Sequence, residues 1–483
     1  MAEYEPVIGM EVHVELRTRS KMFCGCEVAF GGEPNTRCCP VCLGLPGSLP
    51  VVNERAVEYM ARAALALNCT ILPQCVFHRK NYYYPDLPKN YQISQYDYPL
   101  GVNGWVEIMA GGRTKRIAIR RVHMEEDTGK LVHVAGNRSY VDYNRSGVPL
   151  MEIVTQNPPP EGLDQIESAE EAREYLQRLR QILLYLGVSD VKMEEGSMRC
   201  EPNVSVRPKG QEGFGTKTEI KNLNSFRAVY LGVDYEIKRQ IKVLEKGGTV
   251  MQETRRWDDE RGVTVPMRSK EFEQEYRYFP DPDLVPLKFS DEWIEKLRSE
   301  LPELPMAKLK RFTSDYGIPM ADAEVLVDSP ELAEFYDACV SGYRDPKVVA
   351  NWLTTELLRL LNATGKSLGE TSLTPGHVCG LLEMVDAGTI NRNTAKAVFE
   401  EMFSTGKTAL EIVRQKGLEQ VSDEAAIESI VNRVLEANPN EVKRFRAGEV
   451  KLLSWFVGQV MKETRGKANP ATVNKLLQEK LKS

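Results

Sequence analysis

Acidic side chains and a histidine recur in the first third of the chain, in stretches that alternate like strands. Glu11 and His13 are two residues apart, so they share one face of an extended strand. Glu125 and Glu126 end a second alternating stretch, and Glu152 follows a turn rich in glycine and proline. Carboxylates from several strands together with a histidine suit Mg²⁺, which prefers oxygen ligands and shares them with nucleotide phosphates. Taken singly, each acid is more typical of an exposed surface carboxylate than of a metal ligand.

Four of the ten cysteines form two closely spaced pairs. Cys24 and Cys26 are separated by twelve residues from Cys39 and Cys42, with glycines and prolines that favour tight turns. Two such pairs can present four thiolates tetrahedrally, which predicts a structural zinc site with no open position for catalysis. Cys38 could replace one ligand. The alternatives are reduced structural cysteines or an iron–sulfur cluster.

A stretch of cations and aromatic rings covers residues 78–92, with Lys80 near its start. Cations beside rings are suited to phosphate contacts and to base stacking, so this stretch is a candidate for binding a nucleotide or a nucleic acid. A tyrosine-rich loop can equally serve only to pack the core and its turns.

The elements that must position these residues mix strands and helices. Residues 7–16 and 116–124 alternate as strands do, whereas residues 53–67, 168–186 and 225–246 have apolar residues at helical spacing. Strands and helices do not alternate regularly along the chain. The pattern therefore predicts an α+β fold rather than a doubly wound sheet.

Beyond about residue 290 the chain changes to short helices separated by polar turns. We expect three parts: an α+β domain over residues 1–290, an all-α domain over 291–405 and a small helical tail over 406–483. The candidate N-cap residues in the helical parts are Ser290, Ser329, Thr374, Asn391 and Ser422.

Charge is distributed unevenly over the 483 residues. The net charge is -6, but residues 441–483 contain ten Lys and Arg against four Glu, which leaves a net -12 for the rest. A basic tail on an acidic body predicts one module that contacts a polyanion, although a solvated helical face would have the same composition. The cations singled out are Lys443, Arg444, Arg446, Lys462, Arg465 and Lys467.

Several common classes are not indicated. No run of ~18 apolar residues is present, so no membrane span is expected, and the N-terminus lacks the pattern of a signal peptide. A cytoplasmic protein with reduced or metal-bound cysteines is therefore expected. Gly365-Lys366-Ser367 resembles the end of a phosphate-binding loop but lacks the upstream glycine.

Eight stretches between residues 8 and 284 together resemble one family, the B subunit of aspartyl/glutamyl-tRNA amidotransferases (GatB), and the resemblance extends over the whole chain. They are Ile8–His13, Cys39–Gly47, His78–Lys89, His123–Lys130, Asp142–Glu152, Arg199–Ser205, Lys221–Phe226 and Tyr276–Leu284.

The resemblance implies a three-subunit enzyme that converts misacylated Glu-tRNA(Gln) to Gln-tRNA(Gln), or Asp-tRNA(Asn) to Asn-tRNA(Asn). An amidase A subunit would release ammonia from glutamine, and a small C subunit would clasp A and B. The B subunit would use ATP as kinase and transamidase. It implies a glutamine-synthetase-like cradle domain, then a helical domain and a YqeY-like tail that contacts tRNA.

Within this resemblance, Glu11, His13, Glu126 and Glu152 are expected to converge on Mg²⁺. Neighbouring residues on a strand point to opposite faces, so only one of Glu125 and Glu126 is expected to be a ligand, and Glu126 is favoured. Lys80 and nearby arginines are candidates for the ATP phosphates, and Glu125 and Lys80 could also line an exit for ammonia.

A different class of protein fits part of the pattern. A zinc-containing tRNA-binding scaffold without chemistry of its own would also have the cysteine pairs, the basic tail and the tyrosine-rich stretch. The acids and His13 do not by themselves require an enzyme, so the resemblance favours the catalytic interpretation.

Overall fold

The computed structural model of the chain divides into two compact units, residues 1–307 and 308–483. It describes residues 3–134, 136, 138–267, 275–418, 424–464, 468 and 470–482. Over these residues, no helix combines the length and the apolar character that crossing a membrane requires.

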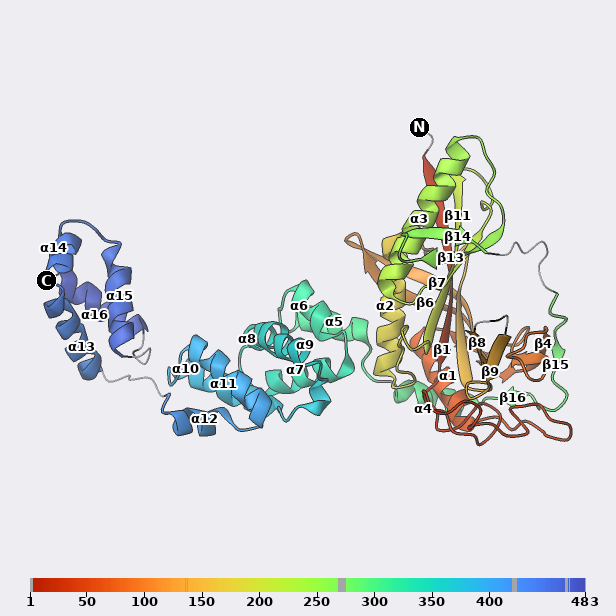
Figure 1. Cartoon of the computed structure of the whole chain (residues 1–483), viewed down its shortest axis with the longest axis horizontal. Helices are drawn as coiled ribbons and strands as arrows, with labels where there is room; N and C mark the ends of the chain where they lie inside the picture. Colours follow the sequence, from red (N-terminus) through yellow and green to blue (C-terminus); the bar gives the residue numbers. More distant parts are fainter. Residues whose placement is uncertain are drawn as a thin grey trace. The chain divides into compact units, whose positions relative to one another are not determined.

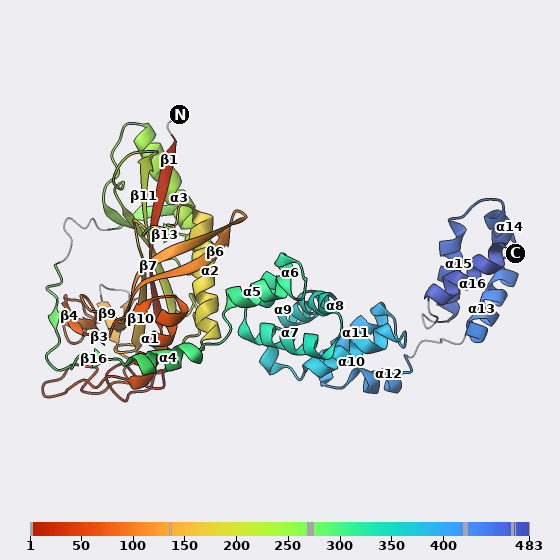
Figure 2. The same ribbon diagram turned by 180° about the vertical axis from the view of Figure 1, so that it is seen from behind.

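A nine-stranded mixed sheet forms the centre of the first unit (Figures 1 and 2). Its strands lie in the order β14-β13-β12-β11-β1-β10-β7-β6-β2. Their bounds are β1 Tyr4–Glu15, β2 Thr70–Ile71, β6 Gly101–Ala110, β7 Arg113–Glu126, β10 Pro149–Thr155, β11 Met198–Pro208, β12 Thr218–Lys221, β13 Glu253–Asp258 and β14 Val263–Pro266. The strands expected at 7–16 and 116–124 are thus confirmed as β1, which ends one residue earlier than expected, and β7.

Three helices pack on this sheet, and they confirm the three expected from apolar spacing. They are α1 Glu54–Ala66, α2 Ala169–Tyr185 and α3 Phe226–Glu245. α2 packs against α3 and β6, α3 against β11, and α1 against β7. Met10 and Val12 of β1 are buried in the same hydrophobic core as residues of these helices. Because strand residues alternate, Glu11 and His13 lie on the opposite face.

Smaller sheets stand beside the large one. The first has the order β15-β4-β5 and contains β4 His78–Asn81, β5 Tyr91–Ser94 and β15 Phe279–Pro280. The others pair β3 Gln74–Cys75 with β16 Leu287–Lys288, and β8 Lys130–Val134 with β9 Arg138–Asp142. The chain therefore returns after residue 275 to lie along the stretch of cations and rings that begins at His78.

The first unit extends past the expected boundary at residue 290. Helix α4, Asp291–Ser299, packs against α1, and Leu297 is buried in the core of the sheet domain. This helix therefore belongs with the α+β unit, which continues to residue 307.

The second unit is helical over its described residues (Figure 1). Its elements are α5 Pro305–Ser314, α6 Met320–Leu326, α7 Pro330–Gly342, α8 Pro346–Trp352, the π-helix Leu353–Leu357, α9 Leu358–Thr364, the 3₁₀ turn Leu368–Glu370, α10 Pro375–Asp386, α11 Arg392–Thr405, α12 Ala409–Lys416, α13 Glu424–Ala437, α14 Pro439–Arg446, α15 Leu452–Glu463 and α16 Pro470–Lys482. α12 packs against α10 and α11, so that group continues past the expected boundary at residue 405. A sheet unit followed by helices confirms the α+β class.

The tail, α13 to α16, has a hydrophobic cluster of its own. Phe456 is fully buried among apolar residues of α13, α15 and α16, including Ile427 and Leu477. The neighbouring Trp455 is 38% exposed. Phe456 therefore packs the core of the tail, whereas Trp455 lies partly at its surface.

Polar side chains define the starts of many helices. Each of the following accepts a hydrogen bond from a backbone N–H of the first turn: Asn53, Ser168, Ser225, Ser290, Ser329, Thr374 and Asn391. Such caps satisfy N–H groups that have no partner within the helix. Ser422, also expected to be a cap, lies outside the described residues.

Candidate active site

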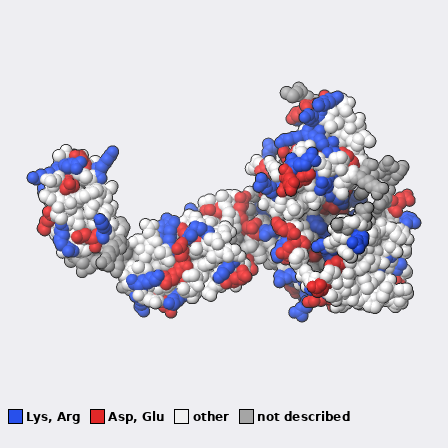
Figure 3. Space-filling model, viewed as in Figure 1, with Lys and Arg blue, Asp and Glu red and all other residues white. Residues whose placement is uncertain are grey.

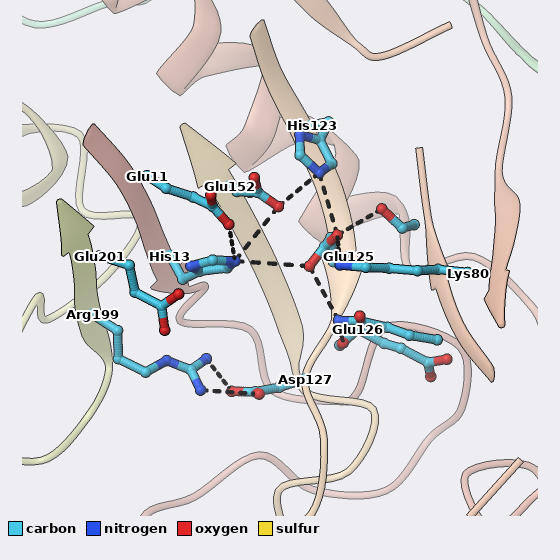
Figure 4. Close-up of polar contacts among 12 residues, drawn as sticks. Glu11, His13, Lys80, His123, Glu125, Glu126, Asp127, Glu152, Arg199 and Glu201 are labelled. Carbon is cyan, nitrogen blue, oxygen red and sulfur yellow. Dashed lines mark hydrogen bonds and ion pairs between the residues drawn. The ribbon is translucent and has the colours of Figure 1, made fainter. Parts of the chain in front are cut away.

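Strand register brings candidate residues from distant parts of the sequence into one row across the sheet (Figure 4). Glu152 of β10 lies opposite His13 of β1 on one side and opposite His123 of β7 on the other. Glu11 lies opposite Glu201 of β11. The row is on the face that the three sheet helices leave uncovered.

Five side chains form what we call the acid–histidine cluster: Glu11, His13, His123, Glu125 and Glu152. His13 Nε2 lies 3.5 Å from Glu152 Oε2, 3.9 Å from Glu11 Oε1 and 4.0 Å from Glu125 Oε2. His123 Nε2 lies 3.0 Å from Glu152 Oε2 and 3.3 Å from Glu125 Oε1. Glu152 thus bridges the two histidines.

Two sets of possible metal ligands overlap at Glu152. One is Glu11, His13 and Glu152, and the other is His123, Glu125 and Glu152; within each set the ligand atoms lie within 4.8 Å of one another. Carboxylate oxygens are the ligands that Mg²⁺ prefers, and imidazole nitrogens can complete such a set. Of the four residues expected to converge on Mg²⁺, the structure brings together Glu11, His13 and Glu152.

Burial and crowding shift the pKa values in the cluster. Burial and the nearby charge of Glu152 raise the pKa of Glu11 to about 7. Burial opposes protonation of His13, but its contacts with Glu152 and the other carboxylates raise its pKa to about 9. Burial alone would raise the pKa of Glu152, but His123 and His13 hold it well below its ordinary value. A divalent cation would supply the positive charge that these acids otherwise take from protons, so the residues fit a metal.

Glu125 is held by residues of β5. Ser94 Oγ donates a hydrogen bond of 2.6 Å to Glu125 Oε1, and Gln92 Nε2 donates one of 3.1 Å to Glu125 Oε2. The Glu125 side chain is only 2% exposed. These bonds fix both carboxylate oxygens beside the two histidines, which a reacting site requires.

Glu126, which the sequence favoured as a metal ligand, lies outside the cluster. Its Oε1 accepts hydrogen bonds from Lys89 Nζ and, at 2.9 Å, from the backbone N–H of Ile93. Strand alternation directs it away from the face that carries His123 and Glu125. The structure therefore corrects this choice, and Glu125 is the member of the pair that can join a metal site.

Lys80 of β4 reaches the cluster from the side opposite β1 (Figure 4). Its Nζ lies 3.8 Å from Glu125 Oε1 and 5.1 Å from the centre of the Tyr276 ring. Burial disfavours its charge, but Glu125 and other neighbours raise its pKa above the ordinary value. A buried lysine that stays cationic can stabilise a phosphate or a carboxylate.

A second charged group adjoins the cluster. Arg199, opposite His13 in the register, donates hydrogen bonds of 3.2 and 2.5 Å to the two oxygens of Asp127. Burial alone would raise the pKa of Asp127, but Arg199 and Arg145 hold it at about 2. Burial and Asp127 raise the pKa of Glu15 to about 8. This group extends the polar face beyond the metal-capable residues.

The four expected cysteines lie together in the turns between β1 and α1. Cys24, Cys26, Cys39 and Cys42 have sulfur atoms within 4.8 Å of one another, and Cys38 is not part of the group. The backbone N–H of Cys39 donates a bond of 3.1 Å to Cys42 Sγ, as is common around metal-bound thiolates. Four sulfurs at this spacing fit a structural metal.

The tail cations are placed differently from the cluster. Those on α14 and α15 are all exposed: Lys443, Arg444, Arg446 and Lys462. Arg444 is paired with Glu449 at 2.7 Å, and Arg446 Nε donates to the backbone oxygen of Leu481 at 3.3 Å. The visible tail surface carries both signs of charge (Figure 3). Arg465 and Lys467 lie outside the described residues.

Sequence reasoning missed three residues that the structure brings to the site. His123 is two residues before Glu125 on the same strand, so the alternation that pairs Glu11 with His13 would also have found it. Gln92 and Ser94 lie on a strand of four residues, too short to give a periodic signal.

Comparisons with known proteins agree over the whole chain. Residues 6–295 match the GatB/GatE catalytic domain, and residues 334–481 match the GatB domain. The B subunit of the aspartyl/glutamyl-tRNA(Asn/Gln) amidotransferase of Carboxydothermus hydrogenoformans is 56% identical over 100% of this chain and 99% of the relative. The protein of the same name from Thermodesulfovibrio yellowstonii is 55% identical over 98% of both chains. The chain therefore belongs to the GatB family, the B subunits of aspartyl/glutamyl-tRNA(Asn/Gln) amidotransferases.

Proposed function

We propose that this chain is the subunit that activates and amidates the amino acid on a misacylated tRNA. With ATP it phosphorylates the side-chain carboxylate of Glu-tRNA(Gln), Asp-tRNA(Asn) or both, and then joins ammonia to it, which makes it part of a carbon–nitrogen ligase. The observation that carries the proposal is the acid–histidine cluster, on a chain that matches its GatB relatives over their whole length.

The chemistry explains why such a cluster is needed. A carboxylate does not react with ammonia, because it is anionic and has no leaving group. Phosphorylation converts it to an acyl phosphate, whose carbon–oxygen bond breaks when ammonia attacks, releasing phosphate. Mg²⁺ would neutralise the charge of the ATP phosphates during this transfer.

Each residue of the site has a distinct part in the proposal. Glu11, His13 and Glu152 would hold Mg²⁺, with Glu125 as a further ligand or as an acceptor for the protons of incoming ammonia. Lys80, 3.8 Å from Glu125, would stabilise negative charge on the phosphoryl group or on the substrate carboxylate. Arg199 with Asp127 would keep the neighbouring face polar and ordered.

The remaining features follow from this role. An amidase A subunit would release ammonia from glutamine, and a small C subunit would join A to this chain. We propose that the sheet unit is a glutamine-synthetase-like cradle, that the cysteines bind a structural Zn²⁺, and that the YqeY-like tail contacts tRNA. The assembly would act in the cytoplasm.

The alternative is a tRNA-binding scaffold with a structural zinc and no catalysis. The cysteine group and the exposed tail cations fit both proposals. The cluster, which is buried at His123, Glu125 and Glu152, favours the enzyme, since a scaffold has no use for three acids and two histidines placed so close together.

A single-turnover experiment tests the proposal. The chain, purified with its A and C subunits, is mixed with Glu-tRNA(Gln) or Asp-tRNA(Asn), and ATP cleavage and amide formation are measured for wild type and Glu11→Gln. We expect tRNA-dependent ATP cleavage to be lost in the variant while glutamine hydrolysis by the A subunit continues. Unchanged ATP cleavage in the variant would favour the scaffold.

A further inference from the structure

A row of aromatic rings leads from the molecular surface to the acid–histidine cluster. The Tyr96 and Tyr278 rings are stacked, with their centres 4.3 Å apart and their planes inclined by 7°. The Tyr276 and Tyr278 rings meet edge to face with their centres 6.0 Å apart, and the Tyr82 and Tyr276 rings do so with their centres 5.8 Å apart. We call Tyr82, Tyr96, Tyr276 and Tyr278 the tyrosine row.

One end of the row is exposed to solvent, and the other lies beside charged residues of the site. At the outer end, Tyr96 remains 45% exposed although Tyr278 lies against it. At the inner end, Lys80 Nζ lies 5.1 Å from the centre of Tyr276 and 3.8 Å from Glu125 Oε1. A flat group stacked on Tyr96 would therefore lie at one end of a series of contacting side chains that reaches Lys80 and Glu125.

The backbone holds the row in place. Asn81 of β4 donates its N–H to the carbonyl of Tyr276 at 2.9 Å, and its side-chain amide donates to the carbonyl of Arg277 at 2.9 Å. Arg277 has a φ of 45°, in the left-handed region that disfavours residues with side chains. Such strain persists only where surrounding bonds enforce it, and it is concentrated at functional sites.

Two positive charges accompany the rings. Arg277 is exposed between the two tyrosines of its segment, and Lys80 stands at the inner end. Aromatic rings with adjacent cations are the arrangement by which proteins bind unpaired nucleotides, the rings stacking on bases and the cations meeting phosphates.

We propose that the tyrosine row stacks the terminal base of the single-stranded acceptor end of the aminoacyl-tRNA, which positions the attached amino acid at Lys80 and Glu125. The inference rests on the proposed function. It favours the tRNA end over the adenine of ATP, because two of the three ligands proposed for Mg²⁺, Glu11 and His13, lie on β1, whereas the row lies beside β4. In-line phosphoryl transfer needs the two substrates on opposite sides of the transferred group.

The test uses the full chain in complex with its A and C subunits. Tyr96→Leu removes the stacking surface, and Tyr96→Phe keeps the ring as the matched control. The affinity of each complex is measured for uncharged tRNA with and without its 3′-terminal adenosine, and the KM for ATP is measured in parallel. Tyr278→Leu and Tyr278→Phe provide a second pair of test and control variants. Glutamine hydrolysis by the A subunit and thermal unfolding curves show whether each complex is assembled and folded.

We expect Tyr96→Leu to weaken binding of full-length tRNA by roughly 5- to 150-fold, the range for one lost base–aromatic stack. Tyr96→Phe should bind as wild type does, and all complexes should bind the shortened tRNA equally. A loss that is the same for both tRNAs, or no loss, overturns the inference. A raised KM for ATP with unchanged tRNA affinity also overturns it, assigning the row to the adenine of ATP.

This outcome is separable from that of the proposed function. Amide formation by the wild-type complex tests the proposed function alone. If the wild type forms the amide while Tyr96→Leu and Tyr278→Leu distinguish the two tRNAs no differently from wild type, only the tyrosine row loses its role.

Discussion

The acid–histidine cluster and the tail helices hold their charged groups under opposite conditions. In the cluster, His123 and Glu125 are 1% and 2% exposed, and Glu152 contacts both histidines. In the tail, Lys443 and Lys462 are exposed on the surfaces of α14 and α15. The cluster is built by strand register, whereas the tail is built by an apolar core that leaves its charges outside.

This difference separates two ways of using charge. Buried groups in a low-dielectric setting act strongly and depend on position to a fraction of an ångström. Exposed cations act weakly, through their number, and tolerate movement and replacement. Single substitutions should therefore abolish the activity of the cluster but change the behaviour of the tail only by degrees.

Replacing Glu152 should have the largest effect. Glu152→Gln removes the charge that bridges His13 and His123 while keeping the shape of the side chain. We expect tRNA-dependent ATP cleavage to fall by about 1,000-fold, at the upper end of the effect of one electrostatic group at a reacting centre. Single-turnover rates measure this.

Two controls accompany the Glu152 experiment. Glu260→Gln makes the same chemical change at an exposed turn and should leave the rate unchanged. Glutamine hydrolysis by the A subunit should also persist in Glu152→Gln. Normal amide formation by Glu152→Gln would remove the acid–histidine cluster from the reaction.

Replacing a cysteine tests a part of the molecule that is neither sheet nor surface helix. The four cysteines lie on turns without strand pairing. A bound metal would hold these turns together, as strand pairing holds the acid–histidine cluster. We expect Cys39→Ser to lower the free energy of unfolding by about 4 kcal/mol and to release the metal, because structural zinc contributes to folding.

Metal analysis and thermal unfolding check the cysteine prediction. Cys38→Ser is the matched control, because Cys38 lies outside the group of four, and it should retain both metal and stability. The choice between Asp-tRNA and Glu-tRNA should stay the same in both variants. Wild-type protein purified without any stoichiometric metal would contradict the prediction.

Neighbouring residues of β7 allow the comparison to be made within one strand. Glu125→Gln should lower the rate of ATP cleavage by about 100-fold, because Glu125 contacts both histidines of the cluster. Glu126→Gln should instead lower stability by about 3 kcal/mol, since it leaves Lys89 buried without its partner. Rates per folded complex, together with unfolding curves, distinguish the two. A larger rate loss in Glu126→Gln would reverse the assignment.

The sequence predicts the local part of this arrangement well. Alternation in β1 was enough to place Glu11 and His13 on one face, and two cysteine pairs were enough to select the four thiols. Both predictions depend only on residues close in sequence. The caps of the helices are equally local, and those within the described residues are confirmed.

The rest depends on register between distant strands. His123 and Glu152 meet His13 only because β7, β10 and β1 are neighbours in the sheet, which no local pattern reveals. The expectation that Glu126 is the ligand is wrong because no local signal shows which face of β7 meets the cluster. The domain boundary at residue 290 failed to include α4 for a similar reason, since α4 is helical in sequence but packs on the sheet unit.

Replacing the tail cations should have the smallest effect, because these charges are exposed whereas those of the cluster are largely buried. Lys443→Gln and Lys462→Gln each remove one exposed charge without touching the core around Phe456. If the tail meets the tRNA backbone, each substitution should weaken tRNA binding only slightly at moderate salt. Lys366→Gln, at an exposed turn before the tail, is the control.

The salt dependence of binding decides whether these lysines meet phosphates. Each phosphate contact releases counterions, so raising salt from about 50 to about 200 mM costs roughly 3-fold in affinity per contact. The double variant should therefore lose about 10-fold less affinity than wild type over this range, while Lys366→Gln follows wild type. A tail that only solubilises the chain would leave both the affinity and its salt slope unchanged. We therefore expect the tail variants to change the salt dependence of tRNA affinity by degrees. Glu152→Gln, in contrast, should nearly abolish ATP cleavage, because the cluster depends on each buried charge.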